Sequence, residues 1–483
     1  MYKTIAFISL LILLGLTAYI PSFDQKDIRL FIFGIIFINT ISLFFFQRDR
    51  LKKYGYLSFI VIFILTYFIV FYQLHILSYF DIQVLETFYY FIWAGKEIET
   101  KSLLFSTIGL ISFYLGFIIY RKNIPIVQNL VDHRKVNINS NFLINLTFIF
   151  YFLFFVTSGS YRTGEYTPED EYFVAKYFYK YFNVFLTASI IHRLSYITRL
   201  SIRKLSIINY LKLFDKRLLI ILFWHLLFSL FVGDRGPIIS YSLLTFSLYA
   251  FRFNKVGISK LLIYTFIASI FFTAVGNIRQ SRYSGESYTE RVKNTFNPPT
   301  ENTKRFDTKI PGESFVELAL SARTLNHVLY NVPKKHDYGY GVYLSSHFFN
   351  IIPGLSGLML ELLHNNDEKY NSSSAFISYL IQGDNPRYGD GTSVIADLYL
   401  DFGLFGVIIV LFLFGTFIGK NEFKFFSGYQ RNSISWVALL IFFSFSAYLA
   451  RSGLFLQLGK IITVYFVIYI NDALNSNHNR LKI

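Results

Sequence analysis

The chain of 483 residues contains no cysteine, and only 16% of its residues are charged. The absence of cysteine excludes disulfides, thiolate metal sites and cysteine nucleophiles. The low charge sets the chain apart from soluble domains, in which roughly 25% of residues are charged. The sequence also has no phosphate-binding glycine loop, no dinucleotide fingerprint and no pair of histidines at a metal-ligand spacing. We therefore expect no nucleotide, metal or other cofactor.

The chain is rich in long runs of apolar residues. Hydrophobic residues make up 53% of it and aromatic residues 20%, and many windows reach the roughly 20 apolar residues needed to cross a bilayer. We predict an all-α, polytopic transmembrane protein with about twelve membrane helices. The first segment lacks a clear cleavage site, so we expect it to be retained. The expected spans are 4–20, 29–46, 56–78, 102–120, 142–157, 178–196, 218–233, 236–252, 261–278, 394–418, 434–450 and 453–471.

The formal net charge of +16 indicates membrane topology rather than nucleic-acid binding. With these spans, the basic clusters fall in the even-numbered connections, which all lie on one side of the membrane, whereas the fifth connection is acidic. The positive-inside rule makes the basic side cytoplasmic. We expect a bacterial inner-membrane protein with both termini in the cytoplasm. The basic residues concerned include Arg48, Arg50, Lys52, Lys53, Arg121, Lys122, Arg199, Arg203, Lys204, Lys212, Lys216, Arg217, Arg252, Lys420 and Lys424.

This topology divides the chain into three parts. Residues 1–278 hold the first nine spans, residues 279–393 form one large outer loop, and residues 394–483 hold the last three spans and a cytoplasmic tail. A loop of that length between spans usually carries function. Its sequence predicts a helix over 313–330, a broken, re-entrant helix pair over 342–363, and a polar, turn-rich segment over 365–390.

Arginines at the outer ends of spans are the first candidate site residues, because the positive-inside rule disfavours them there. Arg235 lies in a Gly-Asp-Arg-Gly-Pro turn between the seventh and eighth spans. Arg279 and Arg282 follow the ninth span, and Arg451 lies between the last two. Guanidinium groups bind phosphate oxygens bidentately, so this set predicts a site for a pyrophosphate headgroup. The alternative is contact with ordinary lipid phosphates, or pairing with a local acid such as Asp234.

The start of the tenth span supplies two candidate carboxylates. Asp397 and Asp401 are four residues apart and so share one helix face. Carboxylates inside a membrane helix are costly and usually face a cavity or a partner. Either one could accept a proton from an attacking hydroxyl or orient an arginine. A purely structural ion pair with Arg235 or Arg451 is the alternative.

Histidines supply two further candidates for a general base near neutral pH. His347 lies in the broken apolar segment of the loop. His327 lies on the expected loop helix, where it shares a face with Arg323. A loop histidine taken alone is more often simply solvated. His192 and His225, inside expected spans, are predicted to form hydrogen bonds between helices.

Three of these features together resemble the Wzy family of O-antigen and capsule repeat-unit polymerases. They are the Gly-Asp-Arg-Gly turn at an outer helix end, the large outer loop late in the chain, and the Thr-Ser-x-x-Ala-Asp-x-Tyr-x-x-Phe-Gly-x-x-Gly pattern beginning at Thr392. The resemblance covers roughly residues 220–420. It implies a GT-C-like glycosyltransferase architecture. It also implies a metal-independent enzyme that moves a growing glycan from undecaprenyl pyrophosphate onto a lipid-linked repeat unit at the outer face.

The resemblance also implies roles for the candidate residues. Arg235, which is also a catalytic candidate, and Arg279 would bind the pyrophosphate, with Arg282, Arg323 and Arg451 next. Asp397 is the first choice for the base and His347 the second. Further substrate contacts would come from Tyr399, Asp401 and His327. The expected partners are the undecaprenyl-pyrophosphate-linked oligosaccharide, membrane lipids, a chain-length regulator and a flippase, and no nucleic acid.

Two other functions are alternatives to the polymerase. A ligase of the O-antigen type would perform the same chemistry on a different acceptor. A flippase for lipid-linked oligosaccharides would have short loops of similar length, so the long outer loop argues against it. The sequence also shows no repeat of the kind on which many transporters are built.

Overall fold

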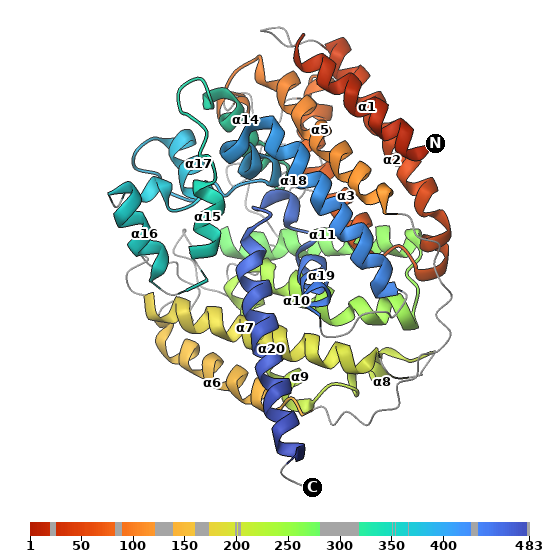
Figure 1. Ribbon diagram of the computed structural model, residues 1–483, viewed down its shortest axis with the longest axis vertical. Coiled ribbons are helices and arrows are strands. Elements are labelled where there is room, and N and C mark those ends of the chain that lie inside the picture. The colour runs from red at the N-terminus through yellow and green to blue at the C-terminus, as the bar shows by residue number, and fades with distance from the viewer. Residues whose placement is uncertain are drawn as a thin grey trace.

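The computed structural model describes residues 1–19, 26–82, 89–120, 139–159, 173–198, 200, 204–280, 318–349, 351–352, 354–365, 367–426 and 433–480. Within these ranges every regular element is a helix (Figure 1), so the all-α prediction is confirmed. Each expected span overlaps one helix. These helices are α1 (Tyr2–Thr17), α2 (Lys26–Tyr54), α3 (Phe59–Tyr79), α5 (Ile98–Ile119), α6 (Asn141–Thr157), α7 (Phe173–Ile197), α9 (Lys216–Val232), α10 (Arg235–Leu248), α11 (Ile258–Gln280), α18 (Val394–Phe426), α19 (Ile434–Phe445) and α20 (Leu456–Arg480).

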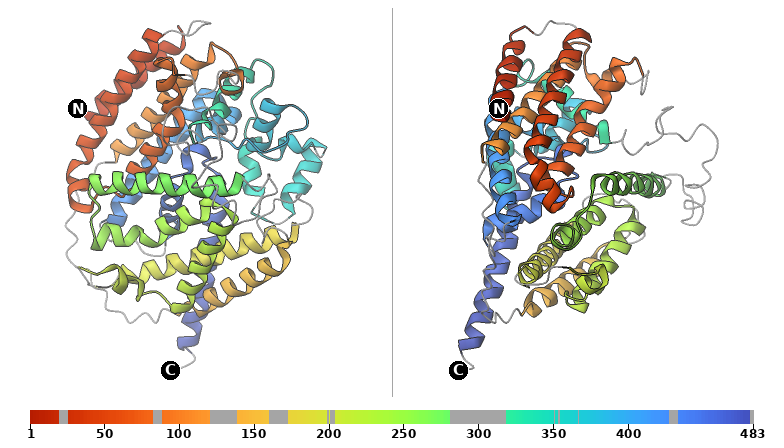
Figure 2. Two further views of the ribbon diagram at one scale, coloured as in Figure 1. Left: turned by 180° about the vertical axis from the view of Figure 1, so that it is seen from behind. Right: turned by 90° about the vertical axis from the view of Figure 1, so that its right-hand side faces the viewer.

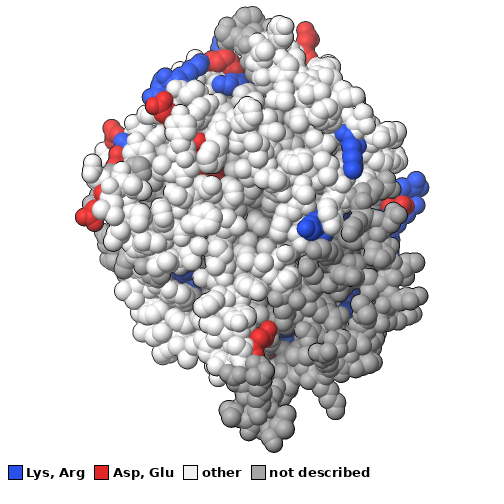
Figure 3. Space-filling model, in the orientation of Figure 1, with Lys and Arg blue, Asp and Glu red and all other residues white. Residues whose placement is uncertain are grey.

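Length and composition identify fewer of these helices as membrane spans. In the described part of the chain, four segments are long and apolar enough to cross a bilayer: Lys26–Tyr54, Phe59–Tyr79, Tyr89–Ile119 and Val394–Glu422. The count of about twelve spans and the GT-C-like architecture therefore stay predictions. Large apolar side chains are exposed along α1, α2, α9 and α11, and charged side chains are sparse over the face drawn in Figure 3. Such a surface suits contact with lipid.

The segment predicted to form the large outer loop is itself helical where it is described. Its helices are α14 (Ala322–Asn331), α15 (Val342–Phe349), α16 (Leu355–His364) and α17 (Ser373–Gln382), with a single 3₁₀ turn at Glu368–Tyr370. The expected loop helix and the expected helix pair, broken after Phe349, are both present. The segment over 365–390, predicted to be polar and turn-rich, also contains α17, which was not predicted. Ser372 caps this helix by accepting the N–H of Ala375, and Phe376 and Ile377 are buried beneath it.

The helices that contact α5 include α1, α2, α3 and α18, and the α5–α18 pair is the closest. Glycines allow this approach: a Cβ on Gly116 would lie 2.0 Å from the carbonyl oxygen of Phe412. A Cβ on Gly415 would lie 2.1 Å from the carbonyl oxygen of Phe113. Gly415 and Gly419 are four residues apart, the small-residue spacing that lets membrane helices pack backbone to backbone.

We expect Gly415→Leu to prevent the packing of α5 on α18, because the new side chain would need the space of the Phe113 carbonyl. Overpacking alone typically costs about 1–3 kcal/mol, and a backbone clash costs more. Gly34→Leu in α2 is the matched control, since nothing lies within 4 Å of a Cβ there. Size-exclusion chromatography of the detergent-solubilised variants should show little folded protein for Gly415→Leu only. Equal yields and melting temperatures for both variants would contradict this packing.

Two buried ion pairs tie α2 to its neighbours. Arg29 pairs with Glu99 of α5 at 2.8 Å, and both side chains are almost wholly buried. Ser78 and Tyr89 donate to the same carboxylate. Twenty-one residues further along α2, Arg50 pairs with Glu422 of α18 at 2.9 Å. Removing one member of such a pair leaves an uncompensated buried charge.

A second group of helices, α6, α7, α9 and α10, lies beside the first (Figure 2). α19 and α20 join the two groups: α19 contacts both α10 and α18, and α20 contacts both α7 and the loop helix α15. The outer loop is thereby brought onto the second group. A cavity lies where α7, α10, α19 and α20 meet α15.

Candidate active site

The cavity has a volume of about 530 Å³ and is open on one side. Four helices contribute to it: α7 and α10 with residues of their N-terminal halves, α20 with its first two turns, and α19 with its last residue, Phe445. In the predicted topology all of these are outer ends. α15 adds His347, and Ile351 follows it. A concave site with a mainly apolar wall and a few polar groups is the usual form of a ligand site.

The Gly-Asp-Arg-Gly segment forms the expected tight turn at the edge of the cavity. Gly233 ends α9 with a left-handed backbone (φ 78°), a conformation that favours glycine. Asp234 then caps α10, because its carboxylate accepts the N–H of Gly236 at 3.0 Å. Asp234 and Gly236 both line the cavity, and Arg235, which is partly exposed, lies between them in the chain. The turn thus presents the start of α10 to the cavity.

His347 and Asp397, which are fifty positions apart in the chain, face each other. The Nε2 atom of His347 lies 3.8 Å from Oδ1 of Asp397, and the two side chains are 8% and 4% exposed. Neither atom has a hydrogen-bond partner in the described part of the chain. The separation is too long for a direct hydrogen bond. His347 lines the cavity, and Asp397 lies behind it.

Arg451 lies in the turn that covers Asp397. It ends the 3₁₀ turn Leu449–Arg451, two residues before Gly453, where a Cβ would lie 2.8 Å from Oδ2 of Asp397. Only glycine lets the backbone pass so close to the carboxylate. Asp397 thus faces His347, and the alternative ion pair with Arg235 or Arg451 stays a prediction.

Asp401 holds the start of the helix that carries His347. Its carboxylate accepts the backbone N–H groups of Gly341 and Tyr343 at 3.2 Å and of Leu344 at 2.7 Å. These are donors that the first turn of α15 leaves unused within the helix. Asp401 of α18 therefore caps the N-terminus of α15. Its contact with substrate stays a prediction.

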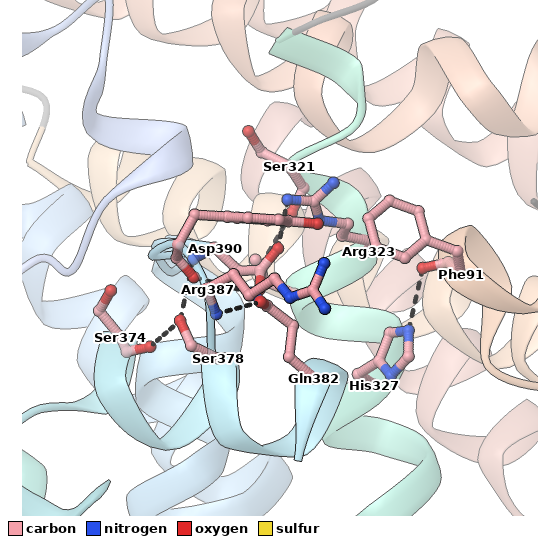
Figure 4. Close-up of polar contacts among 11 residues, drawn as sticks. Phe91, Ser321, Arg323, His327, Ser374, Ser378, Gln382, Arg387 and Asp390 are labelled. Atoms are coloured by element: carbon pink, nitrogen blue, oxygen red, sulfur yellow. Dashed lines mark hydrogen bonds and ion pairs between the residues drawn. The ribbon is translucent and has the colours of Figure 1, made fainter. Parts of the chain in front are cut away.

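Arg323 and His327 share a face of α14, as predicted, and that face contacts α4 (Tyr89–Trp93) rather than the cavity (Figure 4). Arg323 pairs with the fully buried carboxylate of Asp390 and lies 4.5 Å from the ring centre of Phe91. His327 Nε2–H donates to the carbonyl of Phe91 at 3.0 Å. Gln382 of α17 donates to the other oxygen of Asp390. This network joins α14, α17 and α4.

The geometry predicts a specific pH dependence for His327. Burial lowers the pKa of its imidazole, more than the hydrogen bond to Phe91 raises it, so the folded protein holds a neutral ring. The unfolded chain has a pKa of about 6.5 and binds a proton first as pH falls. This contribution to stability is complete above that value and is lost as pH falls through the folded pKa. His327→Gln keeps a donor for Phe91, and its melting temperature should fall less on acidification than the wild type's. Identical slopes would contradict the assignment.

The remaining candidates lie apart from the cavity or outside the described residues. Tyr399 is buried, accepts a hydrogen bond from the Tyr338 hydroxyl at 3.4 Å and lies edge-on to the Phe105 ring. Arg279 lies in the last turn of α11, and its side chain is not among those described. Arg282 lies outside the described residues.

The two span histidines differ from each other. His192 forms hydrogen bonds with Ser140 at 2.9 Å and Asp472 at 3.0 Å, which confirms its predicted role between helices. The same prediction for His225 is wrong: in the described part of the chain neither ring nitrogen has a hydrogen-bond partner. Its ring packs against aromatic side chains, among them Phe182 at 4.8 Å and Tyr241 at 5.7 Å between ring centres.

Sequence reasoning missed two lysines in the cavity wall, Lys180 of α7 and Lys460 of α20. The Lys460 ammonium lies 5.6 Å from the ring centre of Tyr241 and 5.1 Å from that of Phe445. Both lysines fall inside expected membrane spans, where a charge is costly and usually functional. That cost was the signal that could have identified them. The described residues hold no group of three His, Asp or Glu side chains that could bind a metal, and metal independence stays a prediction.

Comparison with known proteins places the chain in one family. The model of the family described as O-antigen polysaccharide polymerase Wzy matches residues 4–472. The match extends well beyond the region 220–420 that carries the sequence resemblance and takes in the N-terminal helices. No curated protein and no solved structure was found to match the chain.

Proposed function

The chain belongs to the O-antigen polysaccharide polymerase Wzy family, and we propose that it joins oligosaccharide repeat units at the outer face of the bacterial inner membrane. In this proposal the growing glycan leaves undecaprenyl pyrophosphate and is added to a new lipid-linked repeat unit. The observation that carries the proposal is the cavity at the predicted outer helix ends, where His347 and the turn containing Arg235 meet. A flippase and a chain-length regulator would supply the substrate and limit the product.

The reaction forms one bond and breaks one. The hydroxyl oxygen of the acceptor sugar bonds to the anomeric carbon of the donor glycan, and the bond from that carbon to the pyrophosphate oxygen breaks. The hydroxyl proton must go to a base, and the pyrophosphate leaves with additional negative charge. Arg235, in the turn that borders the cavity, is the first candidate to supply fixed positive charge for the leaving group, and Arg451 is the second.

His347 suits the role of the base better than Asp397. It lines the cavity, whereas Asp397 lies behind it. A proton on the Nε2 atom that faces Asp397 leaves Nδ1 as the basic nitrogen, and the carboxylate stabilises the imidazolium that forms. The separation of 3.8 Å would have to shorten when substrate binds, as catalytic hydrogen bonds often do. Asp397 as the base itself is the alternative.

Deleting the gene in its host tests this function, with surface glycans and lipid-linked intermediates resolved by size. A polymerase predicts single repeat units on the lipid carrier or the final acceptor, with long chains restored by the intact gene. Long chains that stay on the lipid carrier would instead indicate a ligase. Repeat units trapped at the cytoplasmic face would indicate a flippase, and either result would overturn the proposal.

A further inference from the structure

The cavity has a wall suited to one class of sugar. Its aromatic residues, Tyr179, Tyr241 and Phe445, offer ring faces of the kind on which sugar rings pack. Its neutral polar residues include Asn183, Ser240 and Thr463, whose side chains are partners for sugar hydroxyls. The hydroxyl of Tyr241 donates to the Asn183 side-chain oxygen, which fixes both groups in the wall. The volume of about 530 Å³ lies in the range of small-molecule sites.

The same wall carries a positive charge that no carboxylate of the described residues neutralises by a direct ion pair. Lys460 contacts the rings of Tyr241 and Phe445, and its ammonium is not part of any ion pair there. Among the described residues of the wall, Asp234 carries the one carboxylate, and this carboxylate caps α10. A cation held against two aromatic faces in a membrane helix is strongly attracted to an anion that enters the cavity.

We propose that the cavity binds a negatively charged sugar of the repeat unit, with its anionic group at Lys460. This inference rests on the proposed function and adds to it the class of repeat unit that the enzyme accepts. The charged group is a carboxylate or a phosphate on the sugar itself. Lys460 is then a specificity residue: it selects an acidic repeat unit, while Arg235 and Arg451 serve the leaving pyrophosphate.

Binding of simple sugars to the purified full-length protein in lipid nanodiscs tests this inference. The probes are methyl glucuronide, methyl glucoside and inorganic pyrophosphate, followed by saturation-transfer NMR. We expect the wild type to bind the glucuronide at least ~10-fold more tightly than the glucoside, the equivalent of about 1.4 kcal/mol. Lys460→Gln should bind both weakly and equally, and Lys460→Arg should keep the preference. Lys420→Gln is the control, because Lys420 is exposed and lies over the Tyr120 ring outside the cavity.

Three results would overturn the inference. The wild type could bind both sugars equally, Lys460→Gln could keep the preference, or Lys460→Gln could lose binding of pyrophosphate rather than of the glucuronide. The last result would assign Lys460 to the lipid pyrophosphate. These binding outcomes do not depend on catalysis, so they can be distinguished from a failure of the proposed function. A gene deletion that leaves long glycans intact would refute the polymerase even if Lys460 selects an acidic sugar.

Discussion

His347→Ala should abolish glycan polymerisation while leaving the protein folded. A positioned general base contributes about 100-fold to 10,000-fold to a rate, and among the described residues no other histidine lines the cavity. We expect cells that carry the variant to accumulate single repeat units at a wild-type level of protein. The measurement is the size distribution of surface glycan on a gel, together with the melting temperature of the purified variant.

A second outer-loop histidine supplies the control for this prediction. His336 packs against the rings of Phe376 and Tyr379 and does not line the cavity. His336→Gln should therefore give glycan chains of normal length. Asp397→Asn should reduce the rate less than His347→Ala does, because it removes the orienting carboxylate and not the base. If Asp397→Asn were the more severe change and His347→Gln retained activity, Asp397 would be the base.

Arg235→Ala should lower the rate of polymerisation by about 100-fold to 1,000-fold, the loss typical of one group that stabilises charge in a transition state. Arg235→Lys should restore little of this, because a lysine cannot form the two parallel hydrogen bonds that a guanidinium makes to phosphate oxygens. The rate of release of undecaprenyl pyrophosphate by purified enzyme is the measurement.

The other end of α9 carries a matched control arginine. Arg217 is exposed and pairs with Asp215 at 3.0 Å. It lies in the first turn of α9, at the predicted cytoplasmic end of the helix. Arg217→Ala should leave the rate unchanged. Wild-type rates in both Arg235→Ala and Arg279→Ala would show that the pyrophosphate site has been assigned to the wrong residues.

The helices were predictable from the sequence because their signals are local. Apolar runs of sufficient length indicate where a helix lies in a membrane protein. The Gly-Asp-Arg-Gly residues form a turn through local contacts alone, the left-handed backbone of Gly233 and the capping carboxylate of Asp234. The break between α15 and α16 follows in the same way from Gly354, whose left-handed backbone (φ 81°) favours glycine. α17 was missed because its ten residues lie within a polar, turn-rich stretch, and its burial depends on α14, which packs against it.

The composition of the site was only partly predictable, since it depends on contacts between distant segments. His347 and Asp397 were both candidates, but the distance between them depends on how α15 docks on α18, and Asp401 controls that docking through three backbone N–H groups. Arg323 was expected to bind the pyrophosphate. Its ion pair with Asp390, sixty-seven positions away, was not predictable because it depends on the tertiary fold. Lys460 was not predicted as a site residue, although it lies inside the expected span 453–471.

Polymerisation by the purified chain tests the central claim most directly. Full-length protein in lipid nanodiscs is given undecaprenyl-pyrophosphate-linked repeat units from its host, and the products are resolved by size. The proposal predicts a ladder of lipid-linked glycans with an equal number of released undecaprenyl pyrophosphate molecules for the wild type, and neither for His347→Ala. An unchanged substrate with the wild type, or an equal ladder with His347→Ala, would contradict it.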